Sequence, residues 1–551
     1  MKNKTALLFA LMLLVFAGCQ KYDSGMLKLV IEGMGGDTKM AVNGNVSYWA
    51  EGDKVRINGN LVTINPPNES GNTATTSVEV ESADAFYGVY PSSIYSSNSG
   101  ASYTLNLPAT YTYATTTRQN HTYQNLQTPM VGYTTSSNMQ FKHVTAAIGV
   151  QVVNYYGFTV MVDSIIVSSN LYKLCGETTV TLGNDITVSA ADATVDSTKR
   201  VKMKFDGGET LSILAGDSAT VQVPVLPVGS SNKFTVDVYL HKVDQVAVAA
   251  HFSKEQASAH SMERRMMGYA RTTFGGLFTV NSSLKVIISQ GNLQYQASTG
   301  TWRFATEQYT SILDAAGNNV FDDSRSTQSA WIDLFGWGTS GYDHGNTYYM
   351  PYDYLMGSPS TAYGYGPKSG SNVKRNLMYD NNGDWGKNAI SNGGNMTSVW
   401  HTLTKGQIDT LLTRRSASTI GGTTNARYVK AVVNNIQGLI IFPDNYVHPT
   451  GMTVPGFINT ATKGGWGSNT YNLNKWVKME AAGAVFLPVT GRGSSSSIIT
   501  TSYGNYWSAT QDPSSSVYNA YCLRFYESGL SVSEGAGRYY GHAARLVKYA
   551  Q

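Results

Sequence analysis

Cysteine and charge are both scarce in this chain of 551 residues. It has three cysteines, and charged residues make up only 14% of it. Cys175 and Cys522 lie about 350 positions apart, which argues against a disulfide framework and favours buried free thiols. The formal net charge is +4 and falls to about +2 once Lys2 and Lys4 are removed with the leader segment described below. So small a charge gives no reason to expect a nucleic-acid partner.

The chain also lacks the short motifs that mark most enzymes and metal sites. It contains no phosphate loop, zinc-helix signature, nucleophile elbow or Cys-x-x-Cys pair, and its nine histidines are scattered without metal-ligand spacing. We therefore expect no catalysis, no cofactor and no metal. Asp333, Asp384 and Glu480 are the carboxylates that an acid and base pair for polysaccharide hydrolysis would use. Nothing in the sequence brings them together, and Glu480 in "MEAAGAVFLP" fits an ion pair at the end of a helix or strand.

The only long apolar run lies at the start, in "MKNKTALLFALMLLVFAGC". Its length suits an export signal rather than a membrane-spanning helix. Ala17 and Gly18 directly before Cys19 resemble the bacterial lipobox, although Phe16 stands where Leu is usual. The resemblance implies a lipoprotein signal peptide at 1–18, acyl chains such as palmitate on Cys19, a tether at 19–25 and an outer-membrane anchor. An ordinary secretory signal with a chance cysteine is the alternative, and the leaflet that the lipid faces stays open.

From Met26 the chain alternates apolar and polar residues at strand length, with turns at Gly, Asn and Pro. Examples are "LKLVIEG", "VRINGNLVTIN", "AIGVQVVN", "VDSIIVSS", "VQVPVLP" and "FTVDVYLH". A period of two over about 250 residues predicts β-sandwich structure. Within it we expect Trp49 and Tyr90 to pack in a core, Asp53 to form a turn, and His143 to be structural.

Four stretches in this half resemble, in their order and spacing, the fimbrillin-like surface lipoproteins of the Bacteroidetes. They are "SYWAEGDKVRING" (47–59), "AFYGVYP" (85–91), "TPM" (128–130) and "FKHVTAAIGVQVVN" (141–154). The resemblance implies two stacked β-sandwich subdomains, at 26–140 and 141–275, and a place in or near a surface fibre with other fimbrial subunits as partners.

Shaft subunits of that family are similar to one another in exchanging strands after a protease removes a leading segment, often behind an Arg. Here the first Arg, Arg56, lies inside a predicted strand, and some 275 residues follow "GYARTTFGG". A carboxyl end held inside another domain is poorly placed to donate a strand. We therefore hypothesise a minor, tip or stand-alone adhesin rather than a shaft subunit.

From Phe278 onward Trp and Gly become dense, and one helix signal stands out in "WHTLTKGQIDTLLTRR" (400–415). Leu403, Ile408, Leu411 and Leu412 have helical spacing, and Thr404 with Gln407 predicts a capping box.

The series "WIDLFGWGTSGY", "IQGLIIFPDNY", "GNYWSATQ" and "GRYYGHAARLVK" resembles the C-type-lectin-like domains of the Fibrobacter succinogenes major paralogous type. The resemblance implies an α+β domain at 278–551, covered by the helix. In it "NYWSAT" (505–510) and "AARLVK" (543–548) are strands that pair, Trp507 is packed inside, and Arg545 is held by backbone or carboxylate.

The segment "IDLFGWGTSGYDHG" (332–345) allows two interpretations. Its glycines permit Phe335 and Trp337 to turn inward, with Asp333 and Ser340 tying down loop amides. Alternatively, Trp337 or Tyr342 stacks on a sugar ring while polar neighbours bind hydroxyl groups. We favour burial of Phe335 and Trp337 and exposure of "YDHGNTYY" (342–349), because Tyr and Gly are typical of adaptable recognition loops. A functionless insertion is the alternative. The candidate ligand-binding residues are Tyr342, Asp343, His344, Asn346, Tyr348, Tyr349 and Tyr352.

Sugar-binding C-type lectins, which this half resembles, are similar in holding calcium with a Glu-Pro-Asn type loop and a Trp-Asn-Asp strand. This chain has "FPDNY" (442–446) and "YWSAT" instead, so Asp444 and Asn445 remain as oxygen donors but Ser508 and Ala509 replace the strand ligands. We expect calcium-independent adhesion or recognition of host or bacterial glycans or proteins. A stand-alone glycan-binding lipoprotein unconnected with fimbriae is the second interpretation, and a polysaccharide hydrolase is the third.

Overall fold

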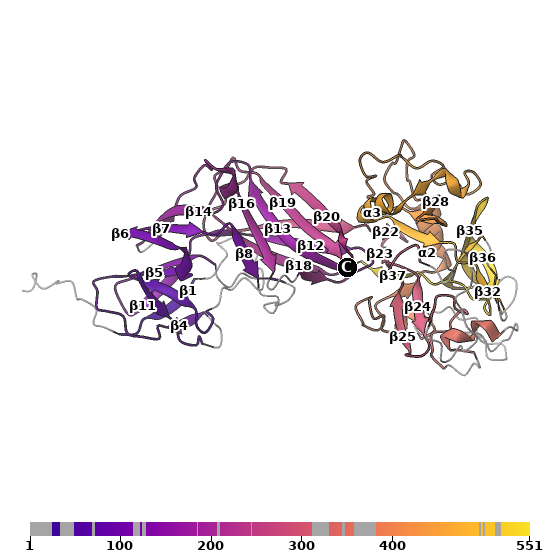
Figure 1. The fold of residues 1–551 in the computed structure, drawn as a ribbon, viewed down its shortest axis with the longest axis horizontal. Helices are drawn as coiled ribbons and strands as arrows, with labels where there is room; N and C mark the ends of the chain where they lie inside the picture. Colours follow the sequence, from indigo (N-terminus) through magenta and orange to yellow (C-terminus); the bar gives the residue numbers. More distant parts are fainter. Residues whose placement is uncertain are drawn as a thin grey trace, which may run out of the picture.

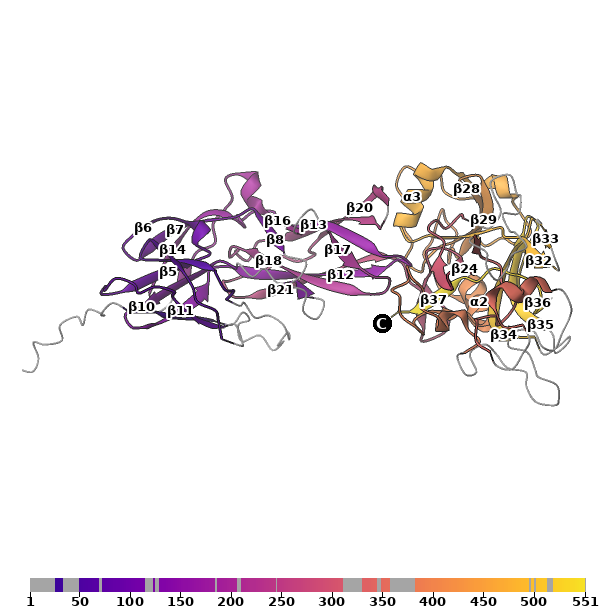
Figure 2. The same ribbon diagram turned by 60° about the horizontal axis from the view of Figure 1, so that its bottom comes forward.

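The structure of this protein is a computed structural model. It describes residues 25–32, 49–68, 72–113, 122–123, 128–183, 186–205, 210–243, 245–310, 330–343, 348–356, 382–494, 497–499, 502–512 and 519–550. Strands account for 48% and helices for only 8%, which confirms the prediction of a mainly β protein. The molecule is elongated, and its N-terminal half (indigo to magenta) and C-terminal half (red to yellow) lie end to end along the long axis (Figures 1 and 2). Among the described residues, no helix has the length and apolar content needed to cross a membrane.

The first sheet has seven strands in the order β3-β2-β5-β10-β11-β1-β4. Its strands are β1 (Lys28–Ile31), β2 (Lys54–Ile57), β3 (Asn60–Thr63), β4 (Thr73–Thr75), β5 (Phe86–Tyr90), β10 (Met130–Thr134) and β11 (Asn138–His143). Trp49 and Tyr90 are buried in its core, with ring centroids 5.0 Å apart in an edge-to-face contact. Asp53 accepts hydrogen bonds from the Ala50 amide (2.9 Å) and from the Tyr90 hydroxyl (2.9 Å), so it closes a turn as predicted.

Two further sheets pack face to face around the core of a β-sandwich. One has the order β21-β12-β18-β9: β21 (Met267–Gly275), β12 (Ala146–Tyr155), β18 (Ser218–Val225) and β9 (Thr122–Tyr123). The other has the order β20-β19-β13-β16-β8. It contains β20 (Gln245–Glu255), β19 (Phe234–Lys242), β13 (Val160–Ser169), β16 (Arg200–Phe205) and β8 (Thr110–Tyr113). β17 (Leu211–Ile213) also pairs with β13. Alternating burial along these strands explains the period of two in the sequence.

Strand pairing crosses residue 140, which sequence reasoning had placed at a subdomain boundary. A four-stranded sheet of order β15-β14-β7-β6 joins β6 (Tyr95–Ser99) and β7 (Ser102–Leu107) to β14 (Gly176–Thr181) and β15 (Thr187–Val188). β8 and β9 likewise pair in parallel with β16 and β18. The chain therefore passes between neighbouring sheets several times before β12 begins.

The C-terminal half is built from small sheets around a core rich in Trp. The first has the order β22-β23-β37-β27 and contains β22 (Phe278–Thr279), β23 (Lys285–Ile288), β37 (Leu546–Tyr549) and β27 (His401–Thr402). The second has the order β25-β24-β26 and contains β24 (Leu293–Gln296), β25 (Thr301–Phe304) and β26 (Trp331–Ile332). The third has the order β30-β28-β29-β31 and contains β28 (Tyr428–Val433), β29 (Ile436–Ile441), β30 (Thr470–Tyr471) and β31 (Val485–Pro488).

The remaining strands form a hairpin and a three-stranded antiparallel sheet. They are β32 (Arg492–Ser494) with β33 (Ser497–Ile499), and β34 (Gly504–Gln511), β35 (Asn519–Tyr526) and β36 (Gly529–Gly537). Residues 505–510 thus lie in β34, and they meet 543–548 only through one parallel bridge between Tyr506 and Ala543. The two segments are neighbours, but β34 forms its ladder with β35, and β37 forms its ladders with β23 and β27.

The predicted helix at 400–415 is present but shorter. His401 and Thr402 form β27, and then α2 (Lys405–Asp409) continues as a π-helical turn over Thr410–Arg414. The capping box is confirmed, since the Thr404 hydroxyl accepts from the Gln407 amide (3.2 Å) and the Gln407 side chain accepts from the Thr404 amide (2.8 Å).

α2 packs on the sheet of β34, β35 and β36. The second helix, α3 (Leu473–Ala481), covers the third sheet.

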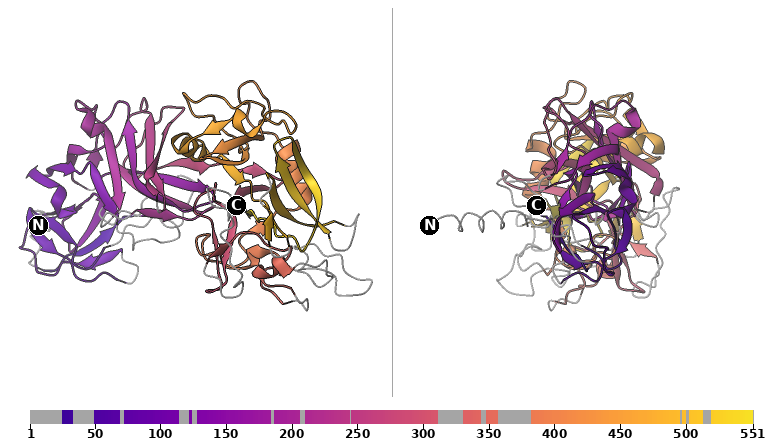
Figure 3. Two further views of the ribbon diagram at one scale, coloured as in Figure 1. Left: turned by 45° about the vertical axis from the view of Figure 1, so that its right-hand side comes forward. Right: turned by 90° about the vertical axis from the view of Figure 1, so that its left-hand side faces the viewer.

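The two halves meet at a tightly packed junction. The Lys242 side chain, 2% exposed, donates to the Thr306 carbonyl (2.9 Å) and lies 3.7 Å from Glu307 and 3.8 Å from Glu480. The Gln290 amide donates to the Gly157 carbonyl (3.0 Å). The carboxyl end of the chain lies beside this junction (Figures 1 and 3).

Candidate functional site

The Trp and Phe of "IDLFGWGTSGY" point into the protein. Phe335 and Trp337 are fully buried, and the Trp337 indole donates to the Ser508 carbonyl (2.8 Å). The Trp507 indole, also buried, donates to the Phe335 carbonyl (2.7 Å). Gly338 and Gly341 have φ values of 77° and 88°, which a side chain would strain. The segment therefore serves packing up to Ser340, and its rings are not available for stacking on a ligand.

Ser340 marks the change from buried to exposed chain. Its hydroxyl donates to the Asn382 carbonyl (2.7 Å) and accepts from the Tyr342 amide (3.4 Å). Asp333, the other residue expected to tie down this loop, is fully buried.

The described tyrosine candidates lie in two segments of the chain, 341–343 and 348–352. Tyr342 is 46% exposed and Asp343 is also exposed, whereas Tyr348, Tyr349 and Tyr352 are half-buried. The Gly341 amide donates to the Tyr349 carbonyl (2.9 Å), which closes the loop and brings Tyr342 near Tyr349. Tyr348 and Tyr352 pack against the Trp-rich core. His344 and Asn346 lie outside the described residues.

The three carboxylates considered for hydrolysis are held by other parts of the chain or buried. Asp384 accepts from the Thr402 amide (2.9 Å), the Thr402 hydroxyl (2.8 Å) and the Gly386 amide (3.1 Å), and its burial raises its pKa. Glu480 accepts from the Gln308 side chain (2.8 Å) and pairs with Lys242. Asp333 is fully buried. Asp384 and Glu480 are therefore engaged by neighbouring residues of the protein itself.

Asp444 is engaged by cations and amides of its own chain. It accepts from the Thr279 amide (3.2 Å), the Thr279 hydroxyl (2.7 Å) and Arg415 (2.8 Å), and Lys285 lies 3.2 Å away. Burial acts to raise the pKa of Asp444, but the hydrogen bonds from Thr279 and the charge of Arg415 outweigh it and lower that pKa. Among the described residues, no group of three or more His, Cys, Asp or Glu side chains is placed to hold a metal ion.

The structure shows which groups surround Arg545 and the two described cysteines. Arg545 donates to the side-chain oxygens of Asn292 (3.3 Å) and Gln308 (2.9 Å), so amide oxygens hold it instead of the expected backbone or carboxylate. Burial lowers the pKa of Arg545 to about 10. Cys175 and Cys522 are free and buried, as predicted, and burial raises their pKa values to about 11 and about 12. Cys19 lies outside the described residues.

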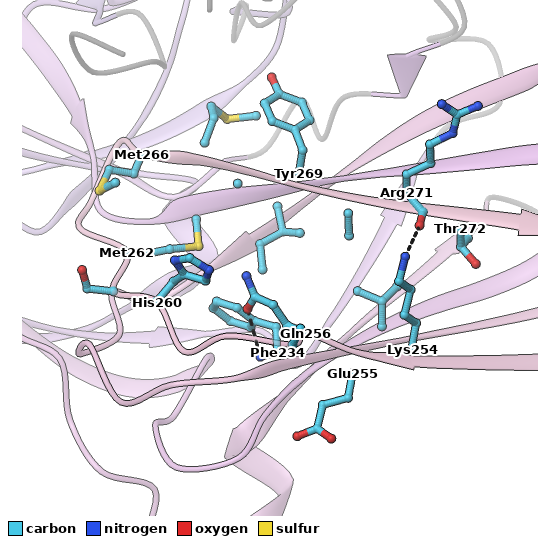
Figure 4. A pocket seen from close by; sticks show the side chains of 17 residues that line it. Phe234, Lys254, Glu255, Gln256, His260, Met262, Met266, Tyr269, Arg271 and Thr272 are labelled. Atoms are coloured by element: carbon cyan, nitrogen blue, oxygen red, sulfur yellow. Dashed lines mark hydrogen bonds between the residues drawn. The ribbon is translucent and has the colours of Figure 1, made fainter. Parts of the chain in front are cut away.

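Sequence reasoning missed a groove in the β-sandwich, which Figure 4 shows from close by. It has a volume of about 480 Å³ and runs between β20 and β21. Among the described strands, β20 and β21 each end their sheet, so each has one edge without a described neighbouring strand. Phe234, Val236, Met262 and Met267 give the groove an apolar lining, with His260 at one end.

The groove has the character of a site for an extended apolar segment. Two free strand edges offer backbone donors and acceptors, and a lining rich in Met adapts to varied side chains. Lys254 spans the groove and donates to the Arg271 carbonyl (3.3 Å), and Tyr269 is exposed beside it. The sequence signal that could have found it is "SMERRMMGY" (261–269), where three methionines fall within a short, otherwise polar stretch.

Solved structures that are similar to this chain in part come from Bacteroides species. No family model matches the chain, and no curated protein matches it. A candidate cell adhesion protein from Bacteroides ovatus is 9% identical and covers 46% of this chain and 92% of its own, with a TM-score of 0.27. One from Bacteroides uniformis is 14% identical and covers 45% and 92%, with a TM-score of 0.27. A fimbrial protein from Bacteroides ovatus is 11% identical and covers 95% and 99%, with a TM-score of 0.22. None of these likenesses assigns a function to this chain.

Proposed function

We propose that this chain is a cell-surface adhesion or recognition protein without catalytic activity, and a minor or tip component of a fimbria. In this proposal residues 1–18 are a signal peptide and Cys19 carries lipid that anchors the protein in the outer membrane. The tether at 19–25 precedes a two-part fimbrillin-like β-sandwich over 26–275, and a C-type-lectin-like domain follows at 278–551. The observation that carries the proposal is the apolar groove between the free edges of β20 and β21.

A groove of this kind accepts an extended strand from another subunit. The occupant would pair its backbone with a free edge and place alternate apolar side chains on Met262 and Met267. The last described strand, β37, is already paired on both sides by β23 and β27. It cannot join another subunit without leaving its own sheet. An acceptor groove fits a subunit that receives a strand from its neighbour in a fibre, and among the described strands β37 is held in its own sheet.

The test is copurification with fibres from cells that produce the protein. Met267→Glu places a charge in the half-buried lining and should lower the amount in the fibre fraction about tenfold, because an apolar partner then faces a buried carboxylate. Leu171→Glu changes an exposed residue outside the groove and should copurify like the wild type. Wild-type protein absent from the fibre fraction, or Met267→Glu present at the wild-type level, would refute the fimbrial assignment.

A second candidate function is glycan or protein recognition by a stand-alone lipoprotein, and exposure of Tyr342 favours it. Tyr342 is exposed to solvent, whereas Tyr348 and Tyr352 pack against the Trp-rich core. Tyr342→Ala should abolish specific binding on an array of glycans and matrix proteins, both with and without a chelator. Tyr503→Ala, which removes another exposed tyrosine, is the matched control. Binding that survives Tyr342→Ala removes this loop from consideration.

A further inference from the structure

A second surface, in the C-terminal half, combines exposed apolar side chains with cations. Residues 442–465 connect β29 to the segment before β30 and lie with α3 on one face of the third sheet. Phe442, Tyr446 and Ile458 from the connection, and Trp476 and Met479 from α3, share one core. The outward residues of both elements therefore lie over the same face, along the side of the C-terminal half marked by α3 and β28 in Figure 1.

The connection is held in place by the chain around it. The His448 ring lies 3.1 Å from the Thr453 carbonyl, which closes the turn between Val447 and Val454. The Asn469 side chain accepts from the Gly456 amide (2.8 Å) and donates to the Gly456 carbonyl (3.1 Å). The Asn459 side chain accepts from the Arg427 amide (2.8 Å). These bonds present the outer residues of the connection in a defined arrangement.

This arrangement directs apolar side chains into solvent. Val447 is 76% exposed, more than any other large apolar side chain among the described residues, and Val454 is exposed beside it. Phe457 is 53% exposed and has a φ of 56°, which is an outlier for a bulky residue. Its ring lies against Gly464, where a Cβ would come within 2.7 Å of it. Backbone strain that displays an aromatic ring to water points to function rather than to folding.

With His counted as neutral, the charged residues within this stretch of the sequence are all lysines. From Asn445 to Met479 the chain has no Asp or Glu, but it has Lys463, Lys475 and Lys478, and all three are exposed. Leu473, at the start of α3, is exposed between them. The two carboxylates that flank this stretch in the sequence are paired, Glu480 with Lys242 and Asp444 with Arg415. The Glu527 carboxylate lies at Gly465.

We propose that this face, made of Val447, Val454, Phe457 and Leu473 with Lys463, Lys475 and Lys478, binds the surface of a bilayer that contains anionic phospholipid. Separate apolar side chains on a protruding connection insert into the soft boundary between headgroups and acyl chains, while the lysines meet lipid phosphates. A folded protein partner would instead need a separate cavity for each of the four exposed apolar side chains, whereas a bilayer deforms around them. The inference goes beyond the proposed function, because it concerns a membrane contact made by the C-terminal half and independent of Cys19.

Vesicle cosedimentation tests this proposal. The chain from Gln20 onward includes every described residue and lacks the acylated cysteine. It should bind vesicles of phosphatidylcholine with phosphatidylglycerol, bind vesicles of phosphatidylcholine alone at least about tenfold more weakly, and be released as salt rises. Inorganic phosphate at equal ionic strength should not compete better than chloride, which separates a lipid surface from a site for free phosphate.

Matched variants assign the binding to this face. The double change Val447→Ser with Phe457→Ser should weaken binding to anionic vesicles about tenfold, and Lys475→Gln with Lys478→Gln should remove most of its salt dependence. Val195→Ser, which changes a valine 56% exposed on the β-sandwich, should bind like the wild type. No binding of the wild type to anionic vesicles, or equal binding by the Val447 and Phe457 variant, would overturn the proposal. Either result leaves the fimbrial test on Met267 unaffected.

Discussion

At the scale of single residues, His143 at the end of β11 shows how burial makes the stability of the first sheet depend on pH. It is fully buried, its ring lies 3.1 Å from the Glu32 carbonyl, and its amide donates to the Glu32 carboxylate (2.7 Å). Burial lowers the pKa of His143 to about 4, and the charges of Arg264 and Arg265 act in the same direction. The unfolded chain binds this proton near pH 6.5, whereas the folded chain does so only near pH 4. Its contribution to stability is therefore complete above pH 6.5 and declines as the pH falls toward 4.

We predict that His143→Gln reduces the acid sensitivity of the N-terminal half. Between pH 7 and pH 4.5 the wild type should lose about 2 to 3 kcal/mol more free energy of unfolding than the variant. Gln keeps a donor for the Glu32 carbonyl, so the comparison isolates the titration. Urea unfolding at the two pH values measures the difference, with His251→Gln, a half-exposed histidine, as the control. Parallel pH dependence in the wild type and His143→Gln would contradict the prediction.

At the scale of elements, the capping box of α2 is a local device whose contribution is measurable. Thr404→Ala removes the hydroxyl that accepts from the Gln407 amide, and it should lower the free energy of unfolding of the C-terminal half by about 1 kcal/mol. Thr404→Ser keeps the acceptor and should lose much less. Guanidinium unfolding followed by Trp fluorescence measures both. Equal losses in the Ala and Ser variants would show that the methyl group, and not the cap, is what matters.

The same element shows which features can be predicted from sequence. Thr404, Gln407 and the apolar spacing act over a few residues, so the cap, the helix and the strand period could be predicted. The π-helical turn after Asp409 and the strand at His401 depend on tertiary partners that the local pattern does not contain. The groove between β20 and β21 depends on which described strands end two sheets. The pairing of β7, β8 and β9 with later strands depends on contacts far apart in the chain. Such non-local arrangements leave little local signal.

At the scale of the whole molecule, the junction at Lys242 joins the two halves into one elongated body. Lys242 lies almost fully buried between Glu307 and Glu480, and its ammonium group is 4.9 Å from the Phe158 ring centroid. The Tyr156 hydroxyl donates to the Ala481 carbonyl (2.6 Å), and Lys548 donates to the Ala215 carbonyl (2.6 Å). Loss of one partner from a buried ion pair leaves the other charge uncompensated, at a cost of about 3 to 5 kcal/mol.

We therefore predict that Lys242→Met separates the halves before it unfolds either of them. Small-angle scattering should show a broader distribution of long distances than in the wild type, and calorimetry should show two transitions further apart in temperature.

Gly157→Ala tests the same junction by packing, because a Cβ there would lie 1.9 Å from the Ile288 carbonyl oxygen. Lys204→Met, an exposed lysine on β16, should change neither measurement. If scattering and calorimetry of both junction variants match the wild type, the two halves are coupled by the short connection between β21 and β22 and not by the buried lysine.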